Sequence, residues 1–278
     1  MELSVELRGQ GMPILCLHGH PGTGRCMAVF TDYLSPHFQT IAPDLRGYGR
    51  SRTTQAFAME KHLDDLSALL ERLDQPCLLL GWSLGGILAM ELALRHPQKI
   101  AGIILVGTAA RPLGRHPAIT WQDNLLTGLA GIINWLIPGW RWNIDTLGQR
   151  SLFRYLISQH SGHAYRHIAK AGTPAFLQTS KLANRALMTA LRQGYNRLED
   201  LHQIRQPCLM LAAANDVHIT PESSQETAAT LPNCEWRLYD NVAHLMPWEI
   251  GPQLCRDIGD WLERYGFLSV GAPTAIDG

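Results

Sequence analysis

The sequence predicts an α/β protein built on a mostly parallel, doubly wound sheet. Short apolar runs of strand length alternate with helix-length segments along most of the 278-residue chain. Strands that are separated by helices form parallel sheets, and helices then cover both faces of the sheet. Charged residues make up only 17% of the chain and hydrophobic residues 46%, which is a globular composition that needs no metal or disulfide to complete its core.

Hydrophobic periodicity predicts the elements in order. Residues 3–7 alternate apolar and polar side chains like a half-buried strand, and residues 14–17 form a buried strand that ends in a glycine-rich loop. Leucines recur at helical spacing through residues 59–73. The remaining predicted elements are strands at 39–42, 77–80, 103–106, 208–212 and 235–239, and helices at 84–96 and 253–265.

The region from residue 111 to residue 205 interrupts this alternation. It contains helical runs, four of the eight tryptophans and no clear strand. We therefore expect a helical cap at 111–205, inserted into a core that is formed by residues 1–110 and 206–268. The last residues, 269–278, are small and mostly polar, and we expect them to form a flexible tail.

Charge and cysteine content limit the class of protein. Lys plus Arg equals Asp plus Glu, 24 of each, so the chain lacks the basic excess that is typical of nucleic-acid-binding proteins. The six cysteines form no CxxC pair, and the first residues have no signal-peptide pattern. The longest uncharged stretch, 125–140, is shorter than the ~20 residues that span a bilayer. We therefore expect a cytoplasmic protein with no nucleic-acid partner.

Residues 81–86 read Gly-Trp-Ser-Leu-Gly-Gly, a G-x-S-x-G motif between a predicted strand and a predicted helix. Such a sharp strand-to-helix turn strains the backbone of its central residue and needs small neighbours two positions to either side. The Ser83 hydroxyl would stand clear of the sheet, and the N–H of Leu84 would face a developing oxyanion. Ser83 is therefore the predicted nucleophile, and a serine N-cap in an ordinary glycine-rich turn is the structural alternative.

A serine nucleophile needs a base, and the base needs an acid that orients it. Asp216 and His244 each follow a predicted strand, and the three residues occur in the chain order Ser83, Asp216, His244. All three lie at the carboxyl ends of strands, where open α/β sheets bind their ligands. Asp240 is a rival acid, but it is too close to His244 along the chain to come from another strand.

The loop at 18–22, His-Gly-His-Pro-Gly, is expected to supply a second N–H for the oxyanion from the backbone of His20. Four residues near the predicted site or in the predicted cap are candidates for the substrate pocket: Trp82, Trp135, His218 and Leu245. For His218, packing within its loop is the structural alternative.

No metal or cofactor is expected. His160, His163 and His167 share one helical face, but Gly162 interrupts them and no Cys or carboxylate joins them. The chemistry of an activated serine also needs no metal ion.

The apolar segment at 125–137 has three interpretations. It is too apolar for a surface helix, so it could pack on the core, or it could form an apolar wall over Ser83 that suits an alkyl or aromatic group. Docking on a membrane surface is the least favoured interpretation, because the segment lacks a basic polar face.

These motifs together resemble the α/β-hydrolase superfamily, in the branch that has a helical cap and a serine nucleophile and includes esterases and lipases. The resemblance extends over about residues 10–265 and rests on 18–22, 43–51, 81–86, Asn215-Asp216, and His244 with Glu249 five residues later. It implies the α/β-hydrolase fold, a cap inserted after the sixth strand, and a structural turn at 43–51. One departure is that a single strand precedes the loop at 18–22, so the first edge strand is expected to be missing.

The nucleophile type separates branches of this superfamily. Relatives that cleave epoxides or carbon–halogen bonds attack with Asp, whereas Ser83 favours attack on an acyl carbon. We therefore expect hydrolysis of small carboxylic esters with a hydrophobic moiety, by a monomer or a homodimer. Cleavage of a diketone-type carbon–carbon bond, amide hydrolysis or acyl transfer on the same triad stay open, and a non-catalytic ligand-binding receptor is the alternative from another class.

Overall fold

Seven strands form one sheet in the order β1-β3-β2-β4-β5-β6-β7 in the computed structural model, which describes residues 1–268. β1 (Val5–Arg8) runs antiparallel to β3 (Gln39–Pro43), and every other neighbouring pair is parallel. This is the mostly parallel sheet of the α/β-hydrolase fold, so the predicted fold class is confirmed. The tail that is predicted at 269–278 lies outside the described residues.

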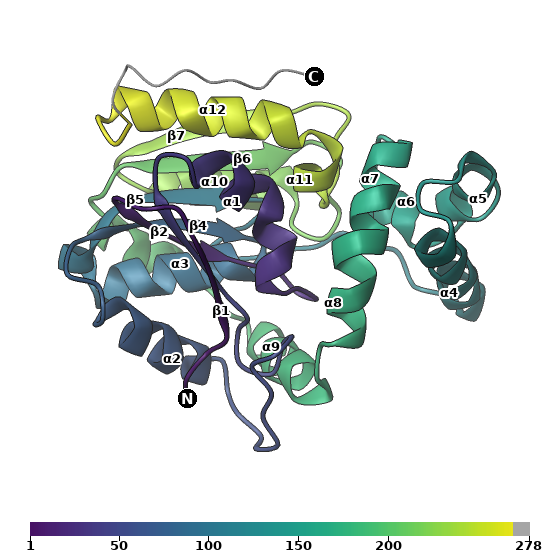
Figure 1. Ribbon diagram of the computed structural model, residues 1–278, viewed down its shortest axis with the longest axis horizontal. Coiled ribbons are helices and arrows are strands. Elements are labelled where there is room, and N and C mark those ends of the chain that lie inside the picture. Colours follow the sequence, from purple (N-terminus) through teal and green to yellow (C-terminus); the bar gives the residue numbers. More distant parts are fainter. Residues whose placement is uncertain (269–278) are drawn as a thin grey trace.

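The central strands contain no charged side chain because helices cover both faces of the sheet. These strands are β2 (Pro13–Leu17), β4 (Cys77–Trp82), β5 (Ile100–Val106) and β6 (Cys208–Ala213), and β7 (Cys234–Tyr239) forms the far edge. On one face lie α1 (Ala28–Leu34) and α12 (Gly251–Arg264), and on the other lie α2 (Glu60–Leu70), α3 (Leu84–Arg95) and α10 (Pro221–Thr230) (Figure 1). The short helices η1 (Gly24–Met27), η2 (Pro97–Lys99) and α11 (Met246–Glu249) complete this part of the chain.

The segment between β5 and β6, residues 107–207, is helical, and we call it the insertion. The resemblance predicts it after a sixth strand, but it follows the fifth, because only β1 precedes β2. Its helices are α4 (Trp121–Leu136), α5 (Arg141–Thr146), α6 (Phe153–Leu156), α7 (Gly162–His167), α8 (Thr173–Leu177) and α9 (Lys181–Arg192), with short turns η3 (Gly148–Arg150), η4 (Ile168–Gly172) and η5 (Leu198–Gln203).

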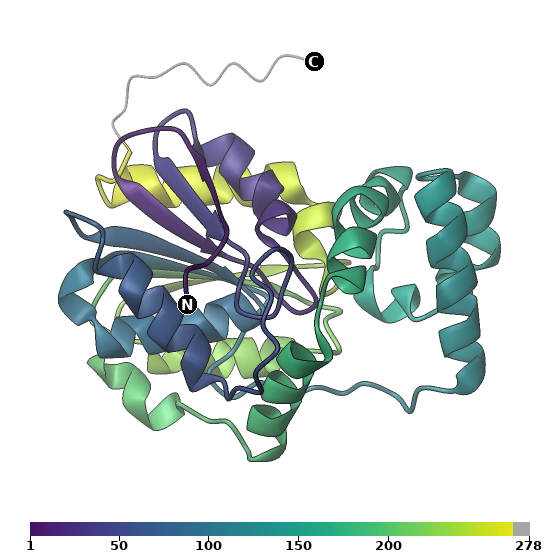
Figure 2. The same ribbon diagram turned by 60° about the horizontal axis from the view of Figure 1, so that its bottom comes forward.

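The insertion has two parts with different surroundings. Ala183 and Leu187 of α9 are buried in the same apolar cluster as the side chains of α2 and α3. In contrast, α4 to α8 project sideways from the sheet, and Figure 2 shows the same arrangement from a second direction. No helix within residues 1–268 is both long enough and apolar enough to cross a bilayer.

His62 is a buried polar residue on the core side of α2. Its ring packs against Phe57 and Tyr48, with centroid separations of 5.1 and 6.0 Å, and neither ring nitrogen has a hydrogen-bond partner among the described residues. Burial, and to a smaller degree the nearby His18, lowers the pKa of His62 to about 3. The imidazole therefore stays neutral in the folded protein at pH values where the unfolded chain binds a proton.

His62→Phe should make the protein less sensitive to acid. The unfolded state takes up a proton at this position below pH ~6.5, whereas the folded state does not, so the free energy of unfolding falls as the pH falls from there towards 3. Removal of this group should make the fall shallower by up to about 1.4 kcal/mol per pH unit. Urea denaturation at several pH values measures the difference. The exposed His202→Gln is the matched control, and parallel curves for wild type and His62→Phe would contradict the argument.

Candidate active site

Ser83 occupies the tight turn between β4 and α3. Its backbone has φ +53° and ψ −116°, a left-handed conformation that is rare for a residue with a side chain. Two glycines make the turn possible: a Cβ on Gly81 would overlap the carbonyl of Gly85, and a Cβ on Gly85 would overlap the carbonyl of Leu17. The G-x-S-x-G spacing is therefore a steric requirement of this turn.

Strand β5 and the residues that follow it hold the turn in place. The N–H of Ser83 donates to the carbonyl of Val106 at 2.9 Å, and the hydroxyl of Thr108 donates to the carbonyl of Ser83 at 2.8 Å. Both backbone polar groups of Ser83 are thus bonded. The side chain is left as the only polar group of this residue that can act elsewhere.

The structure brings together three side chains from the loops that follow β4, β6 and β7. Nε2 of His244 lies 3.1 Å from Oγ of Ser83, and Nδ1 of His244 lies 2.6 Å from Oδ2 of Asp216. The other carboxylate oxygen of Asp216 accepts from the backbone N–H groups of His218 and Ile219, at 2.8 and 3.0 Å. Because a carboxylate only accepts, Nδ1 of His244 is the donor and Nε2 is free to accept the serine proton.

Glu249 fixes the backbone just before His244. One of its buried carboxylate oxygens accepts the N–H of Ala243 at 2.8 Å, and the other accepts the N–H groups of Ser158 and Gln159 at 2.8 and 2.6 Å. Burial raises the pKa of Glu249 above its ordinary value, and these three N–H groups act in the opposite direction. One side chain thereby joins the insertion to the histidine loop. The sequence contains Glu249 in its motif, but nothing in the spacing indicates its partners at 158–159.

The two residues that are predicted to supply N–H groups to an oxyanion flank Ser83. Leu84 is the first residue of α3 and is buried. The 18–22 loop passes directly beside Ser83, because a Cβ on Gly19 would lie 3.2 Å from that of Ser83. The imidazole of His20 is held by the hydroxyl of Tyr48, 2.8 Å from Nδ1.

The buried side chain of His18 stabilises this loop. Its Nδ1 lies 2.8 Å from the carbonyl of Gly19, and its Nε2 accepts the N–H of Leu45 at 3.1 Å. Burial lowers the pKa of His18 to about 4, so the ring is neutral with its proton on Nδ1. The ring connects the 18–22 loop to the turn at 43–51. The carboxylate of Asp44 stabilises the 43–51 turn, because it accepts the N–H groups of Gly24 and Arg50.

Three of the four predicted pocket residues lie beside His244. Trp82 is buried and donates from Nε1 to the carbonyl of His244 at 3.3 Å. The ring of His218 has its centroid 5.1 Å from that of His244, and burial lowers the pKa of His218 to about 3. Leu245 is half-buried directly after His244.

Trp135 is the fourth predicted pocket residue, and its role there stays a prediction. Trp135 lies on α4, is 58% exposed, and points away from the protein because the neighbouring Asn134 takes the inward position on this helix. The structure therefore places Trp135 on the outer surface of the insertion.

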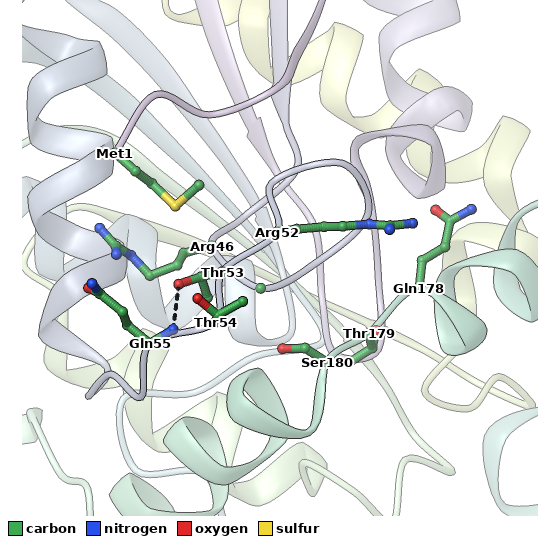
Figure 3. A pocket seen from close by; sticks show the side chains of 10 residues that line it. Met1, Arg46, Arg52, Thr53, Thr54, Gln55, Gln178, Thr179 and Ser180 are labelled. Carbon is green, nitrogen blue, oxygen red and sulfur yellow. Dashed lines mark hydrogen bonds between the residues drawn. The ribbon is translucent and has the colours of Figure 1, made fainter.

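A hollow of about 610 Å³ lies elsewhere, between the 46–55 segment and the residues that precede α9 (Figure 3). Its lining includes Arg46, Arg52 and Ser180. Ser83, Asp216 and His244 do not line it. The guanidinium of Arg46 is already bound to Asp65 by two hydrogen bonds of 2.8 and 2.6 Å. This hollow is therefore separate from the candidate active site.

Comparisons with known proteins identify the family of this chain. A family model described as "Serine aminopeptidase, S33" matches residues 12–250. The pimeloyl-[acyl-carrier protein] methyl ester esterase of Aromatoleum aromaticum is 27% identical over 256 residues, which cover 87% of this chain and 94% of that protein. The proline iminopeptidase PfmaB of Pestalotiopsis fici is 24% identical over 272 residues, which cover 90% and 92%.

Solved structures show the same fold. A thermophilic esterase from Thermogutta terrifontis superposes with a TM-score of 0.67 at 25% identity, over 95% of this chain and 93% of that one. The enol-lactonase from Burkholderia xenovorans LB400 superposes with a TM-score of 0.72 at 19% identity, over 94% and 96%. The second likeness supports the fold alone.

Glu249→Gln should weaken the connection between the insertion and the histidine loop. An amide has one acceptor oxygen, so its NH₂ group must face at least one of the N–H groups that Glu249 now binds. We expect the free energy of unfolding to fall by about 1–3 kcal/mol, because a buried donor is left unpaired. Chemical denaturation measures this loss. The control is Glu226→Gln, which removes a half-exposed ion pair with Arg111, and an equal loss in both variants would refute the assignment.

Proposed function

Because this chain belongs to the serine aminopeptidase S33 family of α/β-hydrolases, we propose that it hydrolyses carboxylic esters of small molecules with a hydrophobic moiety. Ser83 is the proposed nucleophile, His244 the base and Asp216 the orienting acid. The observation that carries the proposal is that one imidazole joins the other two side chains, at 3.1 Å to the hydroxyl and 2.6 Å to the carboxylate.

In the first half of the proposed reaction, Oγ of Ser83 attacks the ester carbonyl carbon while Nε2 of His244 takes the hydroxyl proton. The carbonyl oxygen becomes an oxyanion, which the N–H groups of Leu84 and His20 are proposed to bind. Each such donor is worth ~3–4 kcal/mol of barrier in comparable sites. Asp216 stabilises the imidazolium without taking its proton. The carbon–oxygen bond to the alcohol then breaks, and the alcohol leaves with the proton from His244.

In the second half, a water molecule replaces the alcohol. His244 takes a proton from the water as its oxygen attacks the acyl carbon, and the same N–H groups bind the second oxyanion. Collapse of this intermediate breaks the bond to Oγ of Ser83, which recovers its proton from His244. The products are one alcohol and one carboxylic acid, and the enzyme returns to its starting state.

The carboxylates near the site favour an ester over a peptide with a free amino terminus. An aminopeptidase needs an acidic group to bind the ammonium of its substrate. Asp216 and Glu249 are the buried carboxylates next to His244, and both oxygens of each already accept hydrogen bonds from the protein. Apolar side chains lie there instead. Leu245 and Leu156 are both half-buried, and they are neighbours because the N–H of Leu245 donates to the carbonyl of Leu156.

The cysteines support a reducing compartment, which we propose to be the cytoplasm. All six are free, and five of them are buried among apolar side chains. Burial raises the pKa of each buried thiol, to about 12 for Cys16. These thiols act as small hydrophobic groups in the core.

Ser83→Ala should abolish covalent labelling by a fluorophosphonate. The reagent reacts only with a serine that a neighbouring base activates, so intact-mass analysis should show one adduct in the wild type and none in the variant. The same pair of proteins is compared on p-nitrophenyl esters of increasing acyl length and on proline p-nitroanilide. We expect Ser83-dependent turnover of the esters, rising with acyl length. Labelling that persists in Ser83→Ala, or faster turnover of the anilide, would reject the proposal.

Asp216→Asn should lower kcat for a p-nitrophenyl ester by a factor on the order of 10⁴, because an amide can present its NH₂ group to Nδ1 and favour the wrong tautomer of His244. Folding is checked by circular dichroism. Asp240→Asn is the matched control, since Asp240 is exposed and was the rival acid in the sequence. A large loss in Asp240→Asn with little change in Asp216→Asn would reverse the assignment.

A further inference from the structure

The outer face of α4 is apolar and exposed to solvent. Its side chains recur every three or four positions, as expected for one face of a helix. They are between 44% and 72% exposed: Trp121, Leu125, Leu129, Ile132, Trp135 and Leu136. We call these six residues the outer apolar face. In Figures 1 and 2, α4 lies on the side of α7 and α8 that is away from the sheet.

The inner face of the same helix is polar and bonded to the rest of the insertion. Asn134 donates from its side chain to the carbonyl of Tyr165 at 2.7 Å and accepts the N–H of Gly139 at 2.9 Å. Asp123 binds the guanidinium of Arg154 at 2.7 Å. A rotation of α4 that turned its apolar face inward would break these hydrogen bonds. The hydrogen bonds of the inner face therefore keep the outer apolar face exposed to solvent.

Charge is distributed unequally between the insertion and the rest of the chain. The insertion, residues 107–207, contains 12 Lys and Arg but only 4 Asp and Glu, out of 24 of each in the whole chain. The insertion therefore has a positive excess of eight charges, and the remainder has an equal negative excess. The neutral total conceals a strongly basic segment.

Three cations close to α4 have no acidic partner within the described part of the chain. Both acidic residues of the 121–180 region are used internally, because Asp123 pairs with Arg154 and Asp145 pairs with Arg141. Three exposed cations on elements that pack against or close to α4 have no ion-pair partner among residues 1–268: Arg150, Arg166 and Lys170. Arg166 lies beside Gly139, just after the end of α4.

We propose that the outer apolar face docks the protein on a membrane surface that carries anionic lipid headgroups. Tryptophan and aliphatic side chains enter the boundary between headgroups and acyl chains, and basic residues at the rim bind the headgroups. A second copy of this chain is disfavoured as the occupant, because the two basic insertions would repel each other. The basic rim that α4 itself lacks comes from neighbouring elements of the insertion, which the helix sequence alone does not reveal.

The test is flotation with vesicles of phosphatidylcholine that contain phosphatidylglycerol, compared with vesicles of phosphatidylcholine alone. The full-length protein should bind the anionic vesicles, and added salt should weaken binding. The double variant Leu129→Asp/Ile132→Asp should reduce partitioning by about tenfold or more, because two charges replace exposed apolar groups that would enter the lipid. Arg150→Gln and Lys170→Gln should each reduce it roughly fivefold.

The control is Leu238→Asp, which places the same charge at an exposed leucine of β7, outside the insertion. It should bind the vesicles like the wild type, and all variants should turn over a water-soluble ester, which confirms their folding. The proposal is overturned if the wild type does not bind anionic vesicles, a result that would point to an acidic protein partner. It is also overturned if the double variant binds like the wild type, or if light scattering shows a dimer that this variant dissociates.

Discussion

The steric constraint at the β4–α3 turn determines where Ser83, the proposed nucleophile, is located. A residue with a side chain in the left-handed region costs on the order of 1–3 kcal/mol, so it persists only when its surroundings leave no alternative. Here Val106 of β5 and Thr108, which follows β5, bind the two backbone polar groups of Ser83, and the turn closes too tightly for side chains at Gly81 and Gly85. The backbone of Ser83 is therefore held in place, and the loops after β6 and β7 bring Asp216 and His244 to its side chain.

The insertion is connected to this site through two of its backbone N–H groups. Glu249 binds the N–H groups of residues 158 and 159 with one oxygen and that of Ala243 with the other. A displacement of the insertion is thereby transmitted to the residue before His244. The position of the imidazole and the seating of the insertion are consequently coupled through one buried carboxylate.

The core and the insertion differ in charge and in exposed apolar surface. The core holds the proposed catalytic residues and the negative excess, whereas the insertion holds the positive excess and the outer apolar face. Such a separation favours an orientation in which the insertion meets an anionic surface and the core stays in water. A composition summed over the whole chain averages this asymmetry to zero.

The sequence by itself determined the sheet, the order of its elements and the family, because buried strands and the glycine-bounded serine turn depend on local periodicity and local sterics. Distance along the chain also favoured Asp216 over Asp240, because Asp240 is too close to His244 to come from another strand. Short helices such as α1 and α10 were missed, since PESSQETAAT in α10 has no apolar stripe. Only the tertiary structure decided what α4 faces, where Trp135 lies and which N–H groups Glu249 binds. Periodicity identifies an apolar face, but the partner of that face comes from contacts between residues that are distant in the chain.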